Sequence, residues 1–231
     1  MLSWEQWQQA CLVHANSVKF QDRVKHASEL CLSVLEKIDK PAIAFSTGKD
    51  STVIYHLVKD IAPDIEAFYW DDEFILSTSQ EYLEKVGDIN IRKNEAKHTN
   101  WFKTNIGKKD FLTEFDTVFL GLRADENSYR RKQLSMYGLA YFSKKHQYNI
   151  INPIGWWKLI DVWAYIFSTK RIFNMAYKIM ADNKIEYERQ RIGPFANDRA
   201  LGYGQISILK QCFPDDYNKF IKKYPIARSY A

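Results

Sequence analysis

The sequence predicts an α/β fold with a twisted, mostly parallel sheet and helices on both of its faces. Short apolar runs alternate with helical patterns between residues 40 and 170, which is typical of right-handed β-α-β crossovers. A polar turn containing glycine directly follows the first of these runs. The chain has 231 residues, 46% of them hydrophobic, and is long enough to bury the core of such a sheet.

The elements can be predicted in order along the chain. Two amphipathic helices are expected before the first strand, around residues 4–14 and 24–38, because apolar residues recur there every three or four positions. Strands and helices then alternate: strands 41–45, 65–70, 88–92, 116–121 and 148–152, and helices 50–60, 77–86, near 126–143 and in the tryptophan-rich stretch after 152. Residues 171–231 are expected to form short helices and loops.

The turn at residues 46–51 is the strongest functional signal. It joins a predicted strand to a predicted helix, where backbone amides point at an anion and glycine allows phosphate to approach closely. Lys49 adds a positive charge, and the two serines can donate hydrogen bonds. We therefore predict a nucleotide-binding loop made of Ser46, Thr47, Gly48, Lys49, Asp50 and Ser51.

This loop is not the common phosphate loop, G-x-x-x-x-G-K-[ST], whose serine or threonine binds magnesium. Asp50 follows Lys49 in this chain, and Ile43 stands at the position of the first glycine. The sequence therefore argues against a Walker-type GTPase or ATPase.

Charged residues follow two other predicted strands. Arg123 and Asp125 come just after the strand at 116–121, with Arg130 and Arg131 close behind. Guanidinium groups bind phosphate or sulfate in planar, often bidentate geometry, and ligands in open α/β sheets bind at the carboxyl ends of strands. The alternative is a solvated helix start with internal ion pairs between Asp125 and the arginines.

Asp71 follows the predicted strand at 65–70 and is the preferred functional residue of three consecutive acids. A carboxylate at this position could accept a hydrogen bond from ribose or adenine, or hold a magnesium ion that bridges phosphates. A soluble turn before a helix is the alternative for these acids.

Three ordered segments carry a resemblance to a known family. Residues 46–51 resemble the PP-loop, S-G-G-x-D-S, with Thr47 in place of the first glycine. Residues 121–131 resemble G-x-R-x-D-E-x-x-x-R, and residues 152–166 resemble N-P-[IL]-x-x-W-x-x-x-D-V-W-x-Y-I. Over residues 40–170 the chain is thus similar to the phosphoadenosine-phosphosulfate (PAPS) reductase and ATP sulfurylase small-subunit family of the adenine nucleotide α-hydrolase superfamily.

The resemblance implies a Rossmann-like fold, and an enzyme that cleaves ATP or a related adenine nucleotide at the α-phosphate with the help of Mg²⁺. It implies catalytic roles for Lys49, Arg123 and Arg130, and places Asp71 at an acidic nucleotide-binding position. Second-substrate binding is implied for Asp125, Arg130, Arg131 and Asp161, although Asp161 could equally cap or bridge helices. ATP sulfurylase relatives work with a GTPase subunit, so a partner subunit or a homo-oligomer is a further expectation.

The chain is expected to form one domain, because no linker rich in proline, glycine or serine divides it. Its parts would be N-terminal helices at 1–39, a PP-loop core at 40–170 and a helical extension at 171–231. No apolar run is long enough to span a bilayer and the first residues do not resemble a signal peptide, so a cytoplasmic location is expected.

The three cysteines include no C-x-x-C pair, which argues against a zinc site, a disulfide scaffold or an iron–sulfur cluster. Residues 191–197 resemble the cluster-binding R-x-G-C-x-x-C frame of some relatives, with Pro194 and Asn197 at the cysteine positions. The E-C-G-L-H motif that carries the reductive cysteine of PAPS reductases is missing. Cys212 is the one carboxyl-terminal thiol, and its apolar spacing favours a buried side chain.

Three functions therefore remain open. The first is adenylyl transfer from ATP to an anionic small-molecule acceptor, with release of pyrophosphate. The second is thiol chemistry on a sulfonucleotide, using Cys212 or an external thiol. The third is a regulatory or DNA-associated protein that binds nucleotide without turnover. The net charge of +5 favours anionic ligands in general, and nucleic acid is the less favoured of them.

Overall fold

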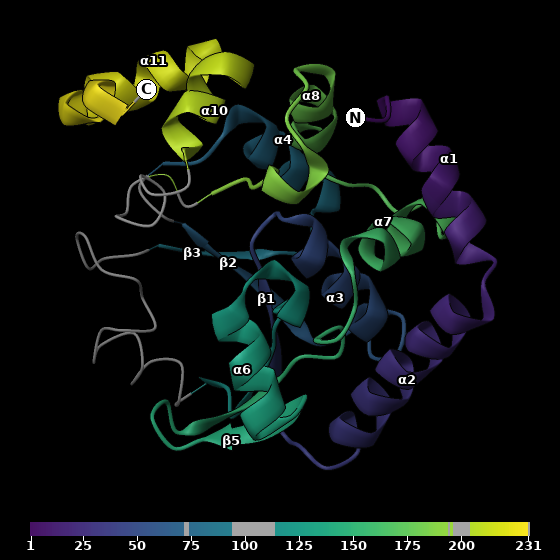
Figure 1. Cartoon of the computed structure of the whole chain (residues 1–231). Coiled ribbons are helices and arrows are strands. Elements are labelled where there is room, and N and C mark those ends of the chain that lie inside the picture. The colour runs from purple at the N-terminus through teal and green to yellow at the C-terminus, as the bar shows by residue number, and fades with distance from the viewer. Residues whose placement is uncertain (72–73, 94–113, 194, 196–203, 231) are drawn as a thin grey trace.

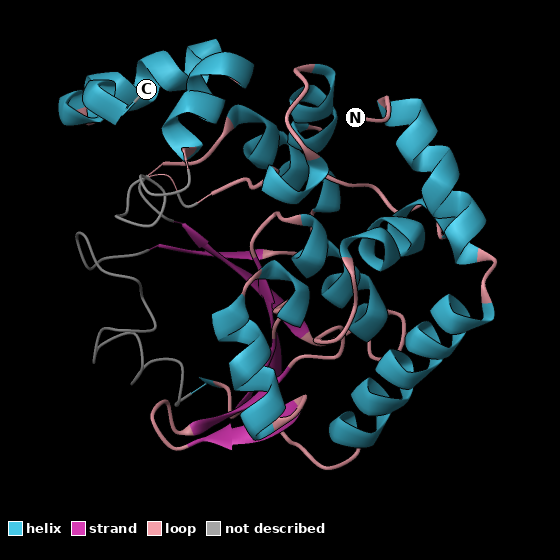
Figure 2. Ribbon diagram, in the orientation of Figure 1, coloured by secondary structure: helices cyan, strands magenta, loops and turns pink. Residues whose placement is uncertain are grey.

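A six-stranded sheet forms the centre of the protein in a computed structural model that describes residues 1–71, 74–93, 114–193, 195 and 204–230 (Figures 1 and 2). The strand order is β3-β2-β1-β4-β6-β5. Neighbouring strands are parallel except β5, which is antiparallel to β6. The strands are β1 Pro41–Phe45, β2 Glu66–Asp71, β3 Asn90–Lys93, β4 Thr117–Phe119, β5 Ala140–Ser143 and β6 Tyr148–Ile151.

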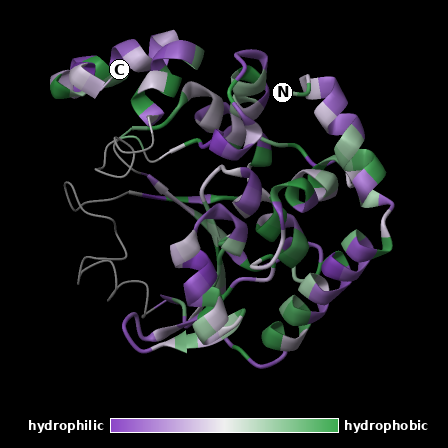
Figure 3. Ribbon diagram, in the orientation of Figure 1, coloured by the Kyte–Doolittle hydropathy of each residue, from purple (hydrophilic) through white to green (hydrophobic). Residues whose placement is uncertain are grey.

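Helices connect and cover the strands. Contacts join α3 to β1 and α7, and α1 and α2 pack outside α7 and α3, respectively. The helices of this region are α1 Trp4–Ala15, α2 Val18–Leu35, α3 Lys49–Lys59, α4 Ser77–Val86, α6 Ser128–Tyr137 and α7 Leu159–Ser168. In Figure 3, α2 carries both hydrophilic and hydrophobic residues, as expected for a helix that buries only one face.

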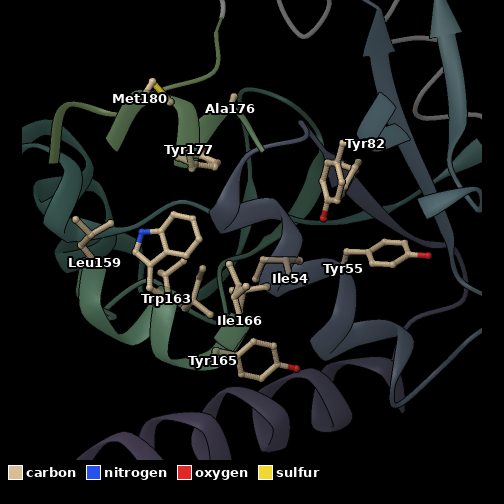
Figure 4. Packing of buried hydrophobic residues seen from close by; sticks show 14 of the residues in the cluster. Ile54, Tyr55, Tyr82, Leu159, Trp163, Tyr165, Ile166, Ala176, Tyr177 and Met180 are labelled. Carbon is tan, nitrogen blue, oxygen red and sulfur yellow. The ribbon is translucent and has the colours of Figure 1, made fainter. Parts of the chain in front are cut away.

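The two faces of the sheet belong to separate apolar clusters. Ile43 and Phe119 point into the large cluster shared with the helices, whereas Ala42 and Val118 belong to a smaller cluster on the opposite face. Successive side chains of a strand alternate between faces, and here both faces are apolar. Figure 4 shows the large cluster, where Trp163 lies among Ile166, Leu159 and Tyr177. The predicted α/β fold with a mostly parallel sheet is confirmed.

The helix predicted near 126–143 is wrong in its second half. Helix α6 ends at Tyr137, and Gly138 follows with a φ of 76°, a positive value that glycine adopts without strain and that other residues rarely adopt. Residues 140–143 then form the edge strand β5. Tyr141 stacks on Tyr137 at 5.1 Å, so the aromatic residues that extended the helical pattern instead join the strand to the helix.

The carboxyl-terminal region is helical, as predicted. Its elements are α8 Ala176–Asp182, α10 Gln205–Cys212, α11 Pro214–Lys223 and the 3₁₀ segments η3 Tyr187–Arg189 and η4 Pro225–Tyr230. Asp216 of α11 is buried and accepts hydrogen bonds from the backbone and hydroxyl of Ser77 at the start of α4. The extension is thereby attached to the sheet domain. Within the described residues, no helix has the length and apolar character needed to cross a bilayer.

His56 makes stability depend on pH. Burial and the nearby Arg171 lower the pKa of His56 from 6.5 to about 4. The unfolded chain therefore takes up the proton first, and this contribution to stability, full above pH 6.5, is lost as the pH falls toward 4. We expect wild type to lose about 1 kcal/mol more than His56→Asn between pH 7 and pH 5, after allowing for solvent screening.

Urea denaturation at both pH values measures this difference. His26→Asn, which changes an exposed histidine of α2, is the matched control. Parallel losses in wild type and His56→Asn would contradict the assignment.

Candidate functional site

The predicted loop lies where the order of the strands reverses. The chain runs from β1 outward to β2 and β3 on one side, and returns to β4 and β6 on the other. In open α/β sheets, the crevice at such a switch point, outside the carboxyl ends of the strands, is where ligands bind. Residues 46–48 leave β1 at this point, and residues 120–123 leave β4 beside them.

Gly121 lets these two segments touch. A Cβ atom on Gly121 would lie 2.8 Å from the carbonyl carbon of Asp50 and 2.9 Å from the backbone nitrogen of Ser51. Real Cβ atoms essentially never approach other heavy atoms this closely. The glycine at the end of β4 therefore fixes the separation between Arg123 and the start of α3.

Gly121→Ala is expected to displace the first turn of α3, with a cost of about 1–3 kcal/mol in stability and loss of nucleotide binding. A thermal-shift titration with ATP plus Mg²⁺ measures both effects. An alanine variant with the melting temperature and the ligand response of wild type would contradict this close contact.

The loop is held by its own hydroxyl groups. The Ser51 hydroxyl accepts hydrogen bonds from the backbone nitrogen and the hydroxyl of Ser46, both at 3.1 Å, and donates to the Gly48 carbonyl at 2.9 Å. Thr47 has a φ of 59°, in the left-handed region where residues other than glycine are strained. The glycine that the PP-loop pattern carries at this position is explained by that conformation.

Buried hydrogen bonds compensate for the backbone strain at Thr47. Its hydroxyl donates to the Ser79 hydroxyl at 3.1 Å, and Asn174 donates to the same oxygen at 2.8 Å. All three side chains are at most 2% exposed. The loop is therefore attached to α4 and to the segment that precedes α8.

Lys49, Asp50 and Arg123 form a buried charge cluster. The Lys49 ammonium lies 3.2 Å from Asp50, and the Arg123 guanidinium donates to the other oxygen of the same carboxylate. Burial alone would raise the pKa of Asp50, but the charges of Lys49 and Arg123 outweigh it and hold this pKa at about 2. Burial lowers the pKa of Lys49 despite the opposing charge of Asp50. Two cations thus share one anion.

The second motif also ties the site together. Asp125 accepts a hydrogen bond from the backbone of Leu159, the first residue of α7, and from Arg123. Arg123 reaches the Trp157 carbonyl at 3.4 Å. The three segments that carried the family resemblance therefore meet around one arginine.

Glu126 gathers two further arginines near this cluster. Arg130 is paired with one of its oxygens, and Arg191 lies 3.4 Å from the other. Arg131 is exposed on α6, and no bond to another described residue places it in the site. The sequence drew attention to Arg191 only through the incomplete cluster-binding frame, and its role beside Glu126 was missed.

Asp71 is the last residue of β2 and is half-buried. It therefore lies at the same edge of the sheet as the loop. Within the described ranges, no group of three or more histidine, cysteine, aspartate or glutamate side chains could hold a metal ion. Mg²⁺ typically takes one or two protein carboxylates together with substrate phosphates. Asp71 could supply such a carboxylate, whereas that of Asp50 is already paired with Lys49 and Arg123.

Asp161 makes the contacts of a structural residue, and its predicted substrate-binding role stays a prediction. Its carboxylate is fully buried, accepts from the Lys158 backbone at 2.6 Å, contacts His14 at 2.7 Å and is paired with Arg23. These bonds cap α7 and fasten α1 and α2 to it. Of the two readings that the sequence left open, the bridging one agrees with these contacts.

The three cysteines are buried and reduced. Burial raises the pKa of Cys212 from 9.0 to about 11, and raises those of Cys11 and Cys31 to about 12. A thiol with such a pKa is almost entirely protonated at neutral pH, whereas the thiolate is the nucleophile. This environment weighs against Cys212 as a reactive group.

Tyr177 of α8 is a site residue that sequence analysis missed. Its hydroxyl accepts a hydrogen bond from the Lys49 backbone nitrogen at 3.0 Å, and the Lys49 ammonium lies 5.3 Å from its ring centroid. No motif marks this position, because the contact spans 128 residues of sequence.

Fold and site together define a class of protein: an α/β protein with a glycine-containing loop and buried cations at the switch point of its sheet. Within that class, the model of the phosphoadenosine phosphosulfate reductase domain matches residues 40–180, and the chain belongs to this family. The predicted family is confirmed.

Relatives and solved structures agree with this family and fold. Sulfate adenylyltransferase subunit 2 of Shewanella woodyi is 27% identical, with 60% of this chain and 60% of that protein covered. This chain therefore spans about three fifths of that relative's length. Yeast FAD synthetase in complex with FAD has a TM-score of 0.56 at 13% identity, covering 93% of this chain and 86% of that one. FMN adenylyltransferase of Candida glabrata in complex with ATP has a TM-score of 0.57 at 10% identity, covering 74% and 65%. At these identities the structural likeness concerns the fold alone.

Proposed function

We propose that this chain binds ATP at residues 46–51 and transfers its adenylyl group to an anionic small molecule. An oxyanion of the acceptor attacks the α-phosphorus, the bond to the oxygen that bridges the α- and β-phosphates breaks, and pyrophosphate leaves. The observation that carries the proposal is the meeting of Lys49 and Arg123 at the loop on the switch point. Sulfate adenylyltransferase subunit 2 among the relatives supports this type of reaction.

The charge balance of the site suits a polyphosphate. Lys49 and Arg123 are each at most 7% exposed and share Asp50 as a common counter-ion. An incoming phosphate would supply further negative charge beside the two cations that share Asp50. Fixed cations in a dry site stabilise charge that develops in a transition state, and do so more strongly than in water. Arg130 and Arg191 extend the positive region on the side of Glu126 and would hold the acceptor together with Arg131.

Mg²⁺ is proposed to enter with the nucleotide phosphates, with Asp71 as its protein ligand. The ion would neutralise phosphate charge. Asp71 is alternatively the acceptor for ribose or adenine, and Asp71→Asn with ATP in the presence and absence of Mg²⁺ separates these roles. A partner subunit, and a cytoplasmic location, remain proposals drawn from the resemblance.

A thermal-shift titration tests the nucleotide, because a ligand that binds only the folded state raises its melting temperature. ATP plus Mg²⁺ is compared with 3′-phosphoadenosine 5′-phosphate, and pyrophosphate release is then followed with sulfate as the probe acceptor. A preference for ATP and release of pyrophosphate are expected. Preference for the 3′-phosphorylated nucleotide, with sulfite released from PAPS, would instead favour the thiol-dependent alternative.

A second candidate, a nucleic-acid-associated protein, is favoured by one property of the chain. No acidic residue occurs between Glu126 and Asp161. Exposed aromatic side chains, Tyr129, Tyr137 and Phe142, accompany the cations of this segment, which are Arg130, Arg131, Lys132, Lys144, Lys145 and Lys158. Aromatic and basic groups together suit single-stranded nucleic acid. Salt-dependent binding of a fluorescent oligonucleotide, without ATP cleavage, would favour this candidate.

A further inference from the structure

The Tyr177 hydroxyl is hydrogen-bonded to the first backbone amide of α3. Its oxygen accepts the hydrogen bond of the Lys49 backbone N–H at 3.0 Å. The side chain is 2% exposed, and its ring packs edge-on against Trp163 with centroids 5.2 Å apart. Figure 4 shows Tyr177 beside this tryptophan in the buried cluster. The first amides of a helix are the groups that bind phosphate in such loops, so a side chain takes the place of an anion here.

Within the described part of the chain, the Tyr177 hydroxyl accepts one hydrogen bond and donates none. Among the described residues, no acceptor lies within hydrogen-bonding distance of the Tyr177 hydroxyl as donor; its one bond is the one it accepts. Buried tyrosine hydroxyls normally find a partner. Burial, with Asp50 nearby, raises the pKa of Tyr177, so the group keeps its proton and remains a donor.

The Tyr177 hydroxyl lies close to Gly48 in the loop. A Cβ atom on Gly48 would lie 3.4 Å from the Ser46 hydroxyl, 3.5 Å from the Tyr177 hydroxyl and 4.0 Å from the Ser51 hydroxyl. Three hydroxyl oxygens thus lie within 4.0 Å of the position that a side chain at residue 48 would take. Ser51 already donates to Gly48, and Ser46 donates to Ser51. Of the three hydroxyls, only that of Tyr177 has no acceptor among the residues that the structure describes.

We propose that Tyr177 is a substrate-binding residue, whose hydroxyl donates to a non-bridging oxygen of the phosphate group held by residues 46–51. The Lys49 amide polarises the hydroxyl by donating to it, and a chain of hydrogen bonds in a buried site is stronger than its separate members. The inference rests on the proposed function insofar as it requires a phosphate-bearing nucleotide at the loop. It does not require that the nucleotide be cleaved.

A purely structural role for the hydroxyl, as a cap on α3, is the competing explanation, and Tyr82 is the matched control. Tyr82 is 3% exposed, and its hydroxyl also bonds to α3, at the Thr52 hydroxyl, and to the Ile172 carbonyl. Tyr177→Phe and Tyr82→Phe each remove one oxygen from a buried ring that contacts the same helix. Loss of a structural hydrogen bond should lower the melting temperature in both variants without a selective effect on ligand binding.

The dissociation constant for ATP plus Mg²⁺ is measured by calorimetry for wild type and both variants, with folding checked by circular dichroism. We expect Tyr177→Phe to raise it about 10- to 100-fold, as for a lost hydrogen bond to a charged group, and Tyr82→Phe to leave it unchanged. Equal dissociation constants in Tyr177→Phe and wild type would overturn the inference, as would a Tyr177→Phe chain that does not fold.

The dissociation constants, taken together with pyrophosphate release by wild type, separate this inference from the proposed reaction. If Tyr177→Phe weakens binding of ATP while wild type releases no pyrophosphate, the Tyr177 assignment stands and adenylyl transfer falls. If binding is unchanged in the variant and wild type releases pyrophosphate, the reverse holds. A wild type that binds neither ATP nor 3′-phosphoadenosine 5′-phosphate would overturn both.

Discussion

Lys49→Ala is expected to reduce pyrophosphate release from ATP by about 10²- to 10³-fold, the effect typical of removing one group that stabilises a transition state, while the chain keeps its fold. Lys49 is 7% exposed and lies at the start of α3, so its ammonium would meet the phosphates in a site with little water. The fold should survive because Asp50 keeps its bond to Arg123. No unpaired buried charge is left behind, which is the costly case.

Lys59→Ala is the matched control for this variant. Lys59 is the last residue of the same helix, has a largely buried side chain and is paired with Asp88. It lies at the opposite end of α3 from the loop. Its replacement is expected to leave the rate of pyrophosphate release unchanged. Undiminished release by Lys49→Ala, or equal losses in both variants, would rule out the role assigned to Lys49.

The sheet and the loop could be predicted because their signals are local. The first strand and the helix at 77–86 have the bounds expected from their apolar periodicity, since turn residues and charges mark their ends clearly. The position of Gly48 and Lys49 directly after a strand indicates the loop. The predicted end of the helix near 126–143 was wrong because Gly138 ends the helix, although the aromatic residues beyond it still match a helical period.

The partners within the site could not be predicted in the same way. Arg123 and Asp50 are 73 residues apart, and sequence reasoning placed both at one edge of the sheet without pairing them. Tyr177 carried no signal, because its function depends on which amide its hydroxyl meets in the folded chain. Long-range pairing is set by the packing of the whole domain, which local patterns do not encode.

Asp161 gives the second large expected effect. Asp161→Ala should lower the free energy of unfolding by about 3–5 kcal/mol, as when one partner of a buried ion pair is removed. The carboxylate is fully buried between His14 and Arg23, and it caps α7 through the Lys158 backbone. The variant would lose the anion that holds α1 and α2 against α7 and leave Arg23 without it.

Urea denaturation measures this loss. Asp60→Ala is the control, because Asp60 is paired with Arg171 at the surface with 47% of its side chain exposed, and such pairs typically contribute about 0.2–1 kcal/mol. A loss in Asp161→Ala as small as that in Asp60→Ala would contradict the structural role.

The response of Asp161→Ala to nucleotide then separates the two roles that the sequence left open for this residue. A bridging carboxylate contributes to the folded state but makes no contact with ligand. Below its lowered melting temperature, the folded variant should therefore bind ATP with the dissociation constant of wild type. If Asp161 binds substrate, its removal should instead lower the affinity for the anionic acceptor or for the nucleotide. That loss would appear at any temperature at which the variant is folded. The buried contacts with His14 and Arg23 favour the first outcome.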